Sequence, residues 1–281
     1  SPNLKTKYTY EAGGQIKTIT PPGQEPWTME YGTADEEEAN GRLMNIKRAS
    51  LIASPSMAQM TIAYGVPLSG SGAPYAMSGS DVAKWGQKDV PQDAAAIFSP
   101  DEVPASPPSS YARATVYYLD AEGQAVNTAT PSGAGTSAPS ITTTEIGEHG
   151  EVVRELTAQN RLRALAAENT VLRAEELETK RHYNADGTEM QEEWGPLHQV
   201  RIAETGVTKS ARLHTVIQYE DAKEGWNGLG PNPHLPTKVT TGASIPGEGV
   251  DADQRSTEIK YDWTLRLPKE TITDSAPGDC S

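Results

Sequence analysis

A short pattern of strand-like residues, a glycine turn and a second strand-like stretch recurs along this chain. In the first copy, over residues 8–31, aromatic residues alternate with polar ones, which is the period of a half-buried strand. The Glu-Ala-Gly-Gly step between the two stretches favours a tight turn, because glycine adopts positive φ without steric cost. The positions that define this copy are Tyr8, Tyr10, Gly14, Trp27 and Tyr31. A lone hairpin cannot bury its own apolar face, so the copies are predicted to stack on one another as an antiparallel sheet.

Weaker copies of the pattern follow at several places. Tyr118 and Gly123 keep the tyrosine and the turn glycine of one copy, and a Pro-Ser-Gly turn follows it at 131–133. Residues 143–154 keep the turn without the tyrosine, and residues 41–46 look like a second strand after a turn lengthened by the acidic run 35–38. Near the end, Tyr261 and Asp262 form a literal Tyr-Asp step with Leu-Arg-Leu-Pro behind it.

Two insertions of different character separate the copies. Residues 66–110 are dominated by Ser, Gly, Pro and Ala, which predicts an irregular loop or a short helix. Residues 155–181 carry leucines at a spacing of three to four with no Gly or Pro, which predicts one amphipathic helix, with a break near Asn169 as the alternative. Its leucines either cover an open sheet face or bind a partner. The predicted organisation is hairpins at 1–65, insertion at 66–110, hairpins at 111–154, helix at 155–181 and hairpins at 182–281.

Composition removes several classes of function. A net charge of −14 opposes binding to nucleic acid and to anionic lipid. No apolar run approaches the ~18 residues of a membrane span, and residues 1–20 lack a signal peptide. The chain begins with Ser rather than Met, so a start is expected to be missing. Cys280 is the single cysteine, which excludes an internal disulfide. The aromatic residues are 11 Tyr and 5 Trp against 1 Phe, a bias toward rings that carry a polar group.

Signatures of catalysis and metal binding fail on inspection. Ser71 lacks the glycine of a nucleophile elbow, and no phosphate-binding loop or zinc-protease motif is present. Residues 251–253 begin like a calcium loop but lack its later ligand and its glycine, so a solvated acidic turn is the alternative. The acidic run 35–38 fits a solvated loop tip or a patch for a basic partner. The histidines at 149, 182, 198, 214 and 234 are dispersed, and a metal site that joins two of them after folding stays open. We therefore predict no enzyme activity, no catalytic residue and no cofactor.

The repeat pattern resembles the RHS or YD-repeat family of bacterial polymorphic toxins, wall-associated proteins, toxin-complex shells and animal teneurins. The matches are strongest at 8–31, 118–133 and 260–268. Residues 197–215 and 233–237 look like the variant of actinobacterial members. The resemblance covers about half of the chain.

The resemblance implies a mainly β fold in which antiparallel hairpins wind into part of a spiralling shell around a polypeptide cargo, such as a C-terminal toxin domain. The recurring tyrosines would join one strand layer to the next by ring contact and a hydroxyl bond. The chain departs from the family because it has no Asp-Pro step for self-cleavage and no toxin-like domain after Leu267. We therefore expect an internal or N-terminal piece of a longer secreted or surface-displayed shell, with the rest of that shell and an enclosed polypeptide as its partners.

Two alternatives come from other classes of protein. The chain could be an adhesion or carbohydrate-binding module that contacts a surface glycan through its tryptophans, which are Trp27, Trp85, Trp194, Trp226 and Trp263. It could also be a lyase or hydrolase on a β-repeat frame, which would need clustered acids or a nucleophile that the motifs do not supply.

Overall fold

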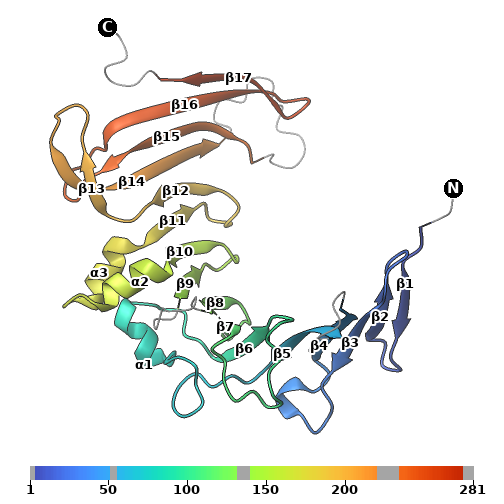
Figure 1. The fold of residues 1–281 in the computed structure, drawn as a ribbon. Coiled ribbons are helices and arrows are strands. Elements are labelled where there is room, and N and C mark those ends of the chain that lie inside the picture. Colours follow the sequence, from blue (N-terminus) through green and yellow to red (C-terminus); the bar gives the residue numbers. More distant parts are fainter. Residues whose placement is uncertain (1–3, 51–55, 132–139, 220–233, 275–281) are drawn as a thin grey trace. The chain divides into compact units, whose positions relative to one another are not determined.

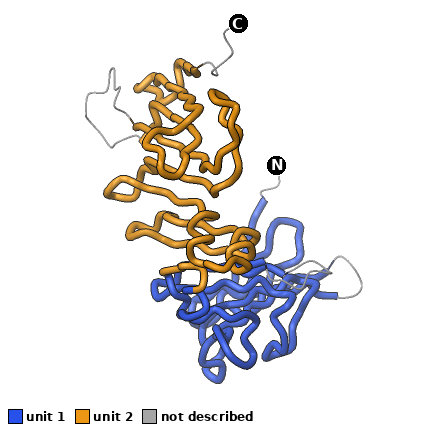
Figure 2. The backbone as a smooth tube through the Cα atoms, turned by 90° about the vertical axis from the view of Figure 1, so that its left-hand side faces the viewer, with its two compact units in different colours: residues 1–83, 89–141 blue, residues 84–88, 142–281 orange. Residues whose placement is uncertain are grey.

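The computed structural model describes residues 4–50, 56–131, 140–219 and 234–274. The chain divides into two compact units, coloured separately in Figure 2. Unit 1 comprises residues 1–83 and 89–141, and unit 2 comprises residues 84–88 and 142–281. Segment 84–88 therefore leaves unit 1 and packs with strands that follow it by more than fifty residues. Trp226, Cys280 and the expected turn at 132–133 lie outside the described residues.

The described residues of unit 1 form eight strands, each paired antiparallel with the next along the chain (Figure 1). Alternation of burial along β6 and β7 shows that these strands face a core on one side, and β8 adds further buried residues. That core includes Met77, Phe98, Val116, Tyr118 and Val126. The strands are β1 (Lys7–Tyr10), β2 (Ile16–Thr20), β3 (Trp27–Tyr31), β4 (Leu43–Ala49), β5 (Met57–Ala63), β6 (Asp93–Phe98), β7 (Ala114–Leu119) and β8 (Ala125–Thr130).

Unit 2 continues with antiparallel strands, and β9 enters it from residue 142. Strands β9 to β12 pair in chain order, β12 pairs with β14, and β14 to β17 again pair in order, while β13 pairs with β14. The strands are β9 (Ser140–Ile146), β10 (Val152–Leu156), β11 (Thr179–Tyr183), β12 (Met190–Trp194), β13 (His198–Arg201), β14 (Thr208–Tyr219), β15 (Pro236–Ser244), β16 (Ala252–Asp262) and β17 (Leu267–Thr273). The prediction of a mainly β fold of antiparallel hairpins is confirmed.

The same tight turn joins the strands of four hairpins in the part of the chain that the structure describes. In each, the N–H of a glycine donates to the carbonyl three residues earlier, as Gly14 does to Glu11 at 2.9 Å and Gly123 does to Asp120 at 3.2 Å. Both glycines have positive φ, +85° and +81°. Gly150 and Gly187 close the corresponding turns at 147–150 and 184–187. The register of each hairpin shifts by one residue beside the turn, which is the bulge expected when a glycine in the left-handed region follows a tight turn.

The helical prediction for 155–181 is wrong in its extent, because the segment forms two short helices between two strands. Leu156 ends β10, and the helices are α2 (Ala158–Leu165) and α3 (Thr170–Leu177). Thr157 and Asn169 are their N-caps, and each side chain accepts the N–H three residues on. The break near Asn169 is thus confirmed, and its cause is this cap. Leu172 of the predicted apolar stripe is 52% exposed, while Leu177 and Ala174 are buried.

The prediction of an irregular loop or a short helix for residues 66–110 is confirmed only in part. They contain helix α1 (Gly79–Val82), the 3-10 turn Ala83–Trp85 and, unexpectedly, strand β6. Strand β6 reads Asp-Ala-Ala-Ala-Ile-Phe, and alanine is a poor signal for a strand. Its pairing with β5 and β7 overrides that local preference. A further 3-10 turn, Glu37–Ala39, occupies the acidic insertion after β3.

Candidate functional site

Among the residues that the structure describes, four tyrosines join neighbouring strands through their hydroxyl groups. Each lies within one residue of the end of a strand, and its hydroxyl donates to the main-chain carbonyl of the first residue of the strand before it in the sheet. The bonds are Tyr31 to Ile16 at 2.9 Å, Tyr64 to Leu43 at 2.9 Å, Tyr219 to Met190 at 3.0 Å and Tyr261 to Pro236 at 2.9 Å. We call these the tyrosine latches. The hydroxyl bond expected of the repeated tyrosines is present at Tyr31 and Tyr261.

The latches run in series within each unit. Ile16, which accepts from Tyr31, is itself the cross-strand partner of Tyr10 in the preceding hairpin. In unit 2, Met190 accepts from Tyr219 and faces Tyr183, and Pro236 accepts from Tyr261 and faces Tyr219. Burial raises the pKa of Tyr219 and of Tyr261, so both hydroxyls stay protonated as donors at neutral pH. Each tyrosine therefore ties its hairpin to the hairpin before it.

The acidic residue after the tyrosine holds the turn. The Asp262 carboxylate accepts the N–H groups of Thr264 and Leu265, both at 3.0 Å. Asp120 accepts two N–H groups in the same way, and Asn184 does so through its amide oxygen. A Tyr-Asp step thus has two separate tasks, one across the sheet and one within the turn.

The other predicted repeat positions lie in different surroundings. Tyr118 is fully buried in the core of unit 1. Tyr8 and Tyr10 are 52% and 59% exposed, and Trp27 is 36% exposed with the Arg48 guanidinium 5.1 Å from its ring. Tyr8 faces Ile19 across β1–β2, and Ile19 faces Trp27 across β2–β3, so these three side chains lie in one row.

The three other tryptophans that the structure describes do not form one contact platform. Trp85 is 1% exposed, so the prediction that it could contact a glycan is wrong. Trp194 is partly buried and stacks on His214, with ring centres 4.6 Å apart. Trp263 packs beside Tyr261 at 5.3 Å.

The acids of the calcium-like stretch have partners within the chain. Asp251 pairs with His214 at 2.6 Å, and Asp253 accepts the N–H groups of Ala203 and Glu204. His234 pairs with Glu189 at 2.8 Å. Within the part of the chain that the structure describes, no three His, Cys, Asp or Glu residues gather as metal ligands.

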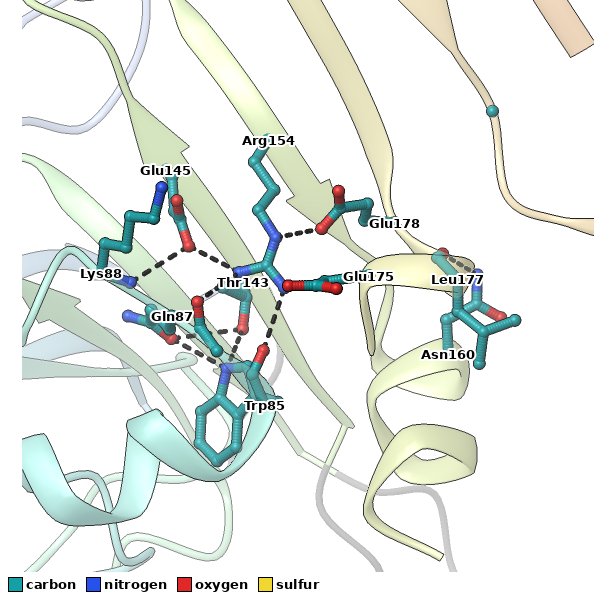
Figure 3. Close-up of polar contacts among 12 residues, drawn as sticks. Trp85, Gln87, Lys88, Thr143, Glu145, Arg154, Asn160, Glu175, Leu177 and Glu178 are labelled. Carbon is teal, nitrogen blue, oxygen red and sulfur yellow. Dashed lines mark hydrogen bonds and ion pairs between the residues drawn. The ribbon is translucent and has the colours of Figure 1, made fainter. Parts of the chain in front are cut away.

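A buried ionic cluster lies where segment 84–88 meets the sheet of unit 2 (Figure 3). The Arg154 guanidinium bonds Glu145 and Glu178, each at 2.5 Å, and donates to the Trp85 carbonyl at 2.9 Å. These three charged residues are 8%, 5% and 9% exposed. We call Arg154, Glu145 and Glu178 the Arg154 network. Burial lowers the pKa of Arg154, but the hydrogen bond to Glu178 and the charge of Glu145 outweigh it and leave this pKa above its usual value.

The Trp85 side chain is a further member of the same buried cluster. Its indole N–H donates to Gln87 and to Thr143, each at 3.0 Å, and the Arg161 guanidinium lies 4.1 Å from its ring. The N–H of Lys88 donates to Glu145 at 3.1 Å. Strands β9 and β10, segment 84–88 and the end of α3 are therefore held together by polar bonds in a buried setting.

A cleft of about 590 Å³ opens over the Arg154 network, and we call it the basic cleft. Five cationic and three acidic side chains line it, together with Val153 and Trp194, in a chain whose net charge is −14. The charged lining residues are Lys88, Glu145, Arg154, Glu175, Glu178, Lys180, Arg181 and Arg212. Arg212 donates to the carbonyls of Glu178 and Gly195 at 3.1 and 2.9 Å, and to that of Glu175.

Sequence reasoning missed the Arg154 network, the basic cleft and two of the latches. Residues 183–187 carry the tyrosine, turn and glycine of the repeat with Asn184 in the acidic position, so this copy was detectable. Tyr64 is followed by Gly65 rather than by an acid, which hides it, whereas Tyr219 is followed by Glu220 and Asp221, so this latch was detectable in the sequence. Arg154 and Glu145 lie opposite one another in the hairpin predicted at 143–154, but the other partners of Arg154, the Trp85 carbonyl and Glu178, lie 69 and 24 residues away and have no local signal.

No protein-family model matches the chain, and no curated protein matches it significantly. Among solved structures, the chain is similar to the crystal structure described as TcdB2-TccC3-TEV, with 11% identity and a TM-score of 0.42 over 96% of this chain and 11% of that chain. It is also similar to the Photorhabdus luminescens Tc holotoxin pore, with 9% identity and a TM-score of 0.41 over the same shares of the two chains. The chain therefore spans 11% of the length of these matched chains.

Proposed function

We propose that this chain is a non-enzymatic segment of a shell of the RHS or YD-repeat type, which encloses or presents a polypeptide cargo such as a toxin domain. The observation that supports this most is the series of tyrosine latches, in which Tyr219 and Tyr261 each tie one hairpin to the hairpin before it. Such a series extends a sheet by repeated addition, and a structural wall needs this property while a catalytic domain does not.

The mechanism of such a segment is steric. A continuous sheet keeps solvent and proteases from the polypeptide behind it. The net charge of −14 suits a basic cargo and limits self-association. The proposed partners are the rest of the longer shell and the enclosed polypeptide, and the proposed location is outside the cell or at its surface. The actinobacterial type, inferred from residues 197–215 and 233–237, is part of the same proposal. Among the described residues, no helix is long and apolar enough to cross a membrane.

Electron microscopy of the protein expressed from its complete reading frame tests the proposal. A hollow particle with polypeptide density inside it is the expected result. Limited proteolysis gives a second readout, because an enclosed domain is cut only after the shell is opened by denaturant. A flat or filamentous particle without a cavity, or a cargo domain cut as fast as the free domain, would contradict the cargo role.

The row of Tyr8, Ile19 and Trp27, in which the two aromatic side chains are exposed and Ile19 is half-buried, favours a second candidate, binding of a surface glycan. Aromatic faces stack on sugar rings, and this row is accessible in unit 1. A glycan array with the unmodified chain and with Trp27→Ala tests it. Met57→Ala is the matched control, because Met57 is 43% exposed on another strand of the same unit. Saturable binding that Trp27→Ala abolishes and Met57→Ala retains is expected from a glycan module, whereas no binding on the array rules out this candidate.

A further inference from the structure

The cations that line the basic cleft differ in whether a carboxylate neutralises them. Arg154 has Glu145 and Glu178, and Arg181 has Glu155 and Glu193. Lys88, Lys180 and Arg212 form a second group. Among the described residues, none of these three has a carboxylate within 4.0 Å of its charged nitrogens.

Arg212 is the most informative member of this second group. Its guanidinium donates to main-chain carbonyls of Glu175, Glu178 and Gly195, so the hydrogen bonds hold it in place without cancelling its charge. Burial lowers the pKa of Arg212, and the charges of Glu178 and Glu176 only partly offset this. A partly desolvated cation whose hydrogen bonds all go to neutral carbonyl groups gains more from an added anion than a solvated one does.

The acidic lining limits the charge of such an anion. Glu145, Glu175 and Glu178 face the same cleft and repel a dianion more strongly than a monoanion. A single carboxylate therefore fits the charge balance better than a phosphate monoester does. The cleft also has an apolar wall, formed by Val153 and by the Trp194 ring, whose orientation is set by its stacking on His214.

We infer that the basic cleft binds a monoanionic carboxylate that carries an adjacent apolar group, with Lys88, Lys180 and Arg212 facing the carboxylate and Trp194 facing the apolar group. The free C-terminus of a peptide and a small organic acid share this chemistry. The inference rests on unit 2 alone and does not depend on the proposed shell function.

Calorimetric titration of the 281-residue chain with N-acetylleucine tests the site, and the neutral N-acetylleucinamide is the matched ligand. The acid is expected to bind at least about tenfold more tightly than the amide, because the amide loses the charge-assisted bonds. Binding of the acid should weaken as salt rises from about 50 mM to about 500 mM. Equal affinity for the two ligands, no binding of either, or tighter binding of inorganic phosphate would overturn the inference.

Variants assign the binding to this cleft. Lys88→Gln and Lys180→Gln remove exposed charges that hold no described partner, so the variants are expected to keep the melting temperature of the parent chain. Each variant should bind N-acetylleucine about two- to fivefold more weakly and bind N-acetylleucinamide with unchanged affinity. Lys269→Gln, on exposed β17, is the matched control and should change the affinity for neither ligand. Effects of the cleft variants no larger than that of Lys269→Gln would place the binding elsewhere and refute the site.

A second pair of probes identifies the source of the carboxylate. A short peptide of glycine and serine that ends in leucine is compared with its C-terminal amide. Tighter binding of the free-acid peptide than of N-acetylleucine supports the site and assigns it to a polypeptide terminus. Weaker binding of the peptide supports the site and assigns it to a small organic acid. The indole N–H signal of Trp194, assigned with Trp194→Phe, should shift with either ligand, and an unmoved signal would contradict the assigned apolar wall.

Discussion

Replacing Arg154 by methionine is expected to destabilise unit 2 by about 3–5 kcal/mol. The variant keeps a long apolar stem but leaves Glu145 and Glu178 as buried carboxylates without their cation. It also removes the bond to the Trp85 carbonyl at 2.9 Å. Most of the cost comes from the two uncompensated charges, since a buried charge that loses its partner keeps its desolvation penalty.

Native-state hydrogen exchange is the suitable assay, because it reports the opening free energy of the β9–β11 amides separately from those of unit 1. Arg173→Met is the matched control, since Arg173 pairs with Glu176 on a half-exposed helix surface. That change should cost less than about 0.5 kcal/mol.

A triple variant tests the explanation itself. Adding Glu145→Gln and Glu178→Gln to Arg154→Met removes both orphaned charges while the glutamine oxygens can still accept hydrogen bonds. At least about half of the lost stability should return, because neutral side chains have a smaller desolvation penalty than carboxylates. An Arg154→Met effect no larger than that of Arg173→Met, or a triple variant as unstable as the single one, would refute the reasoning.

Three further changes probe the repeat and the buried indole. Tyr219→Phe should lower the free energy of unfolding in chemical denaturation by about 0.5–1.5 kcal/mol, because it loses the latch to the Met190 carbonyl. Tyr117→Phe, whose hydroxyl has no described bond, should leave that free energy unchanged. Equal effects of the two changes would contradict the latch. Gly123→Ala should lower the free energy of unfolding by about 1–2 kcal/mol through the backbone φ of +81° alone, because an added Cβ would meet open space there. Gly249→Ala also adds a Cβ in open space and should leave that free energy unchanged. Trp85→Phe should lower stability by about 1–3 kcal/mol because Gln87 and Thr143 lose a buried donor, and an unchanged melting temperature would disprove that role.

The hairpins were predictable because their determinants are local. The turn of Glu11 to Gly14 depends on residues three apart, and Asp120 and Asp262 bond N–H groups within four residues of themselves. The glycine that closes such a turn is visible in the sequence wherever the pattern recurs. The predicted tyrosine bond also follows from position, because Tyr31 and Tyr261 lie within one residue of the ends of strands whose neighbours belong to the adjacent hairpins.

Competition between local signals explains what was mispredicted. The leucine spacing of 155–181 indicated one helix, but the N-caps at Thr157 and Asn169 start two separate helices. The two ends of the segment belong to strands instead, because β10 pairs with β9 and β11 pairs with β12. The alanines of β6 carry little strand preference, and that strand exists because β5 and β7 supply hydrogen bonds on both sides.

By itself, then, the sequence determined the strand-turn-strand repeat, because each turn and each alternating strand is specified within a few residues. Tertiary structure alone decided where Arg154 meets segment 84–88 and Glu178. Arg154 bonds the carbonyl of Trp85 and the carboxylate of Glu178, residues 69 and 24 positions away, and no local pattern encodes those separations. Burial strengthens the electrostatic attraction in these contacts, since the same side chains in water would attract one another only weakly. The basic cleft depends on that packing and so could be found only in the folded chain.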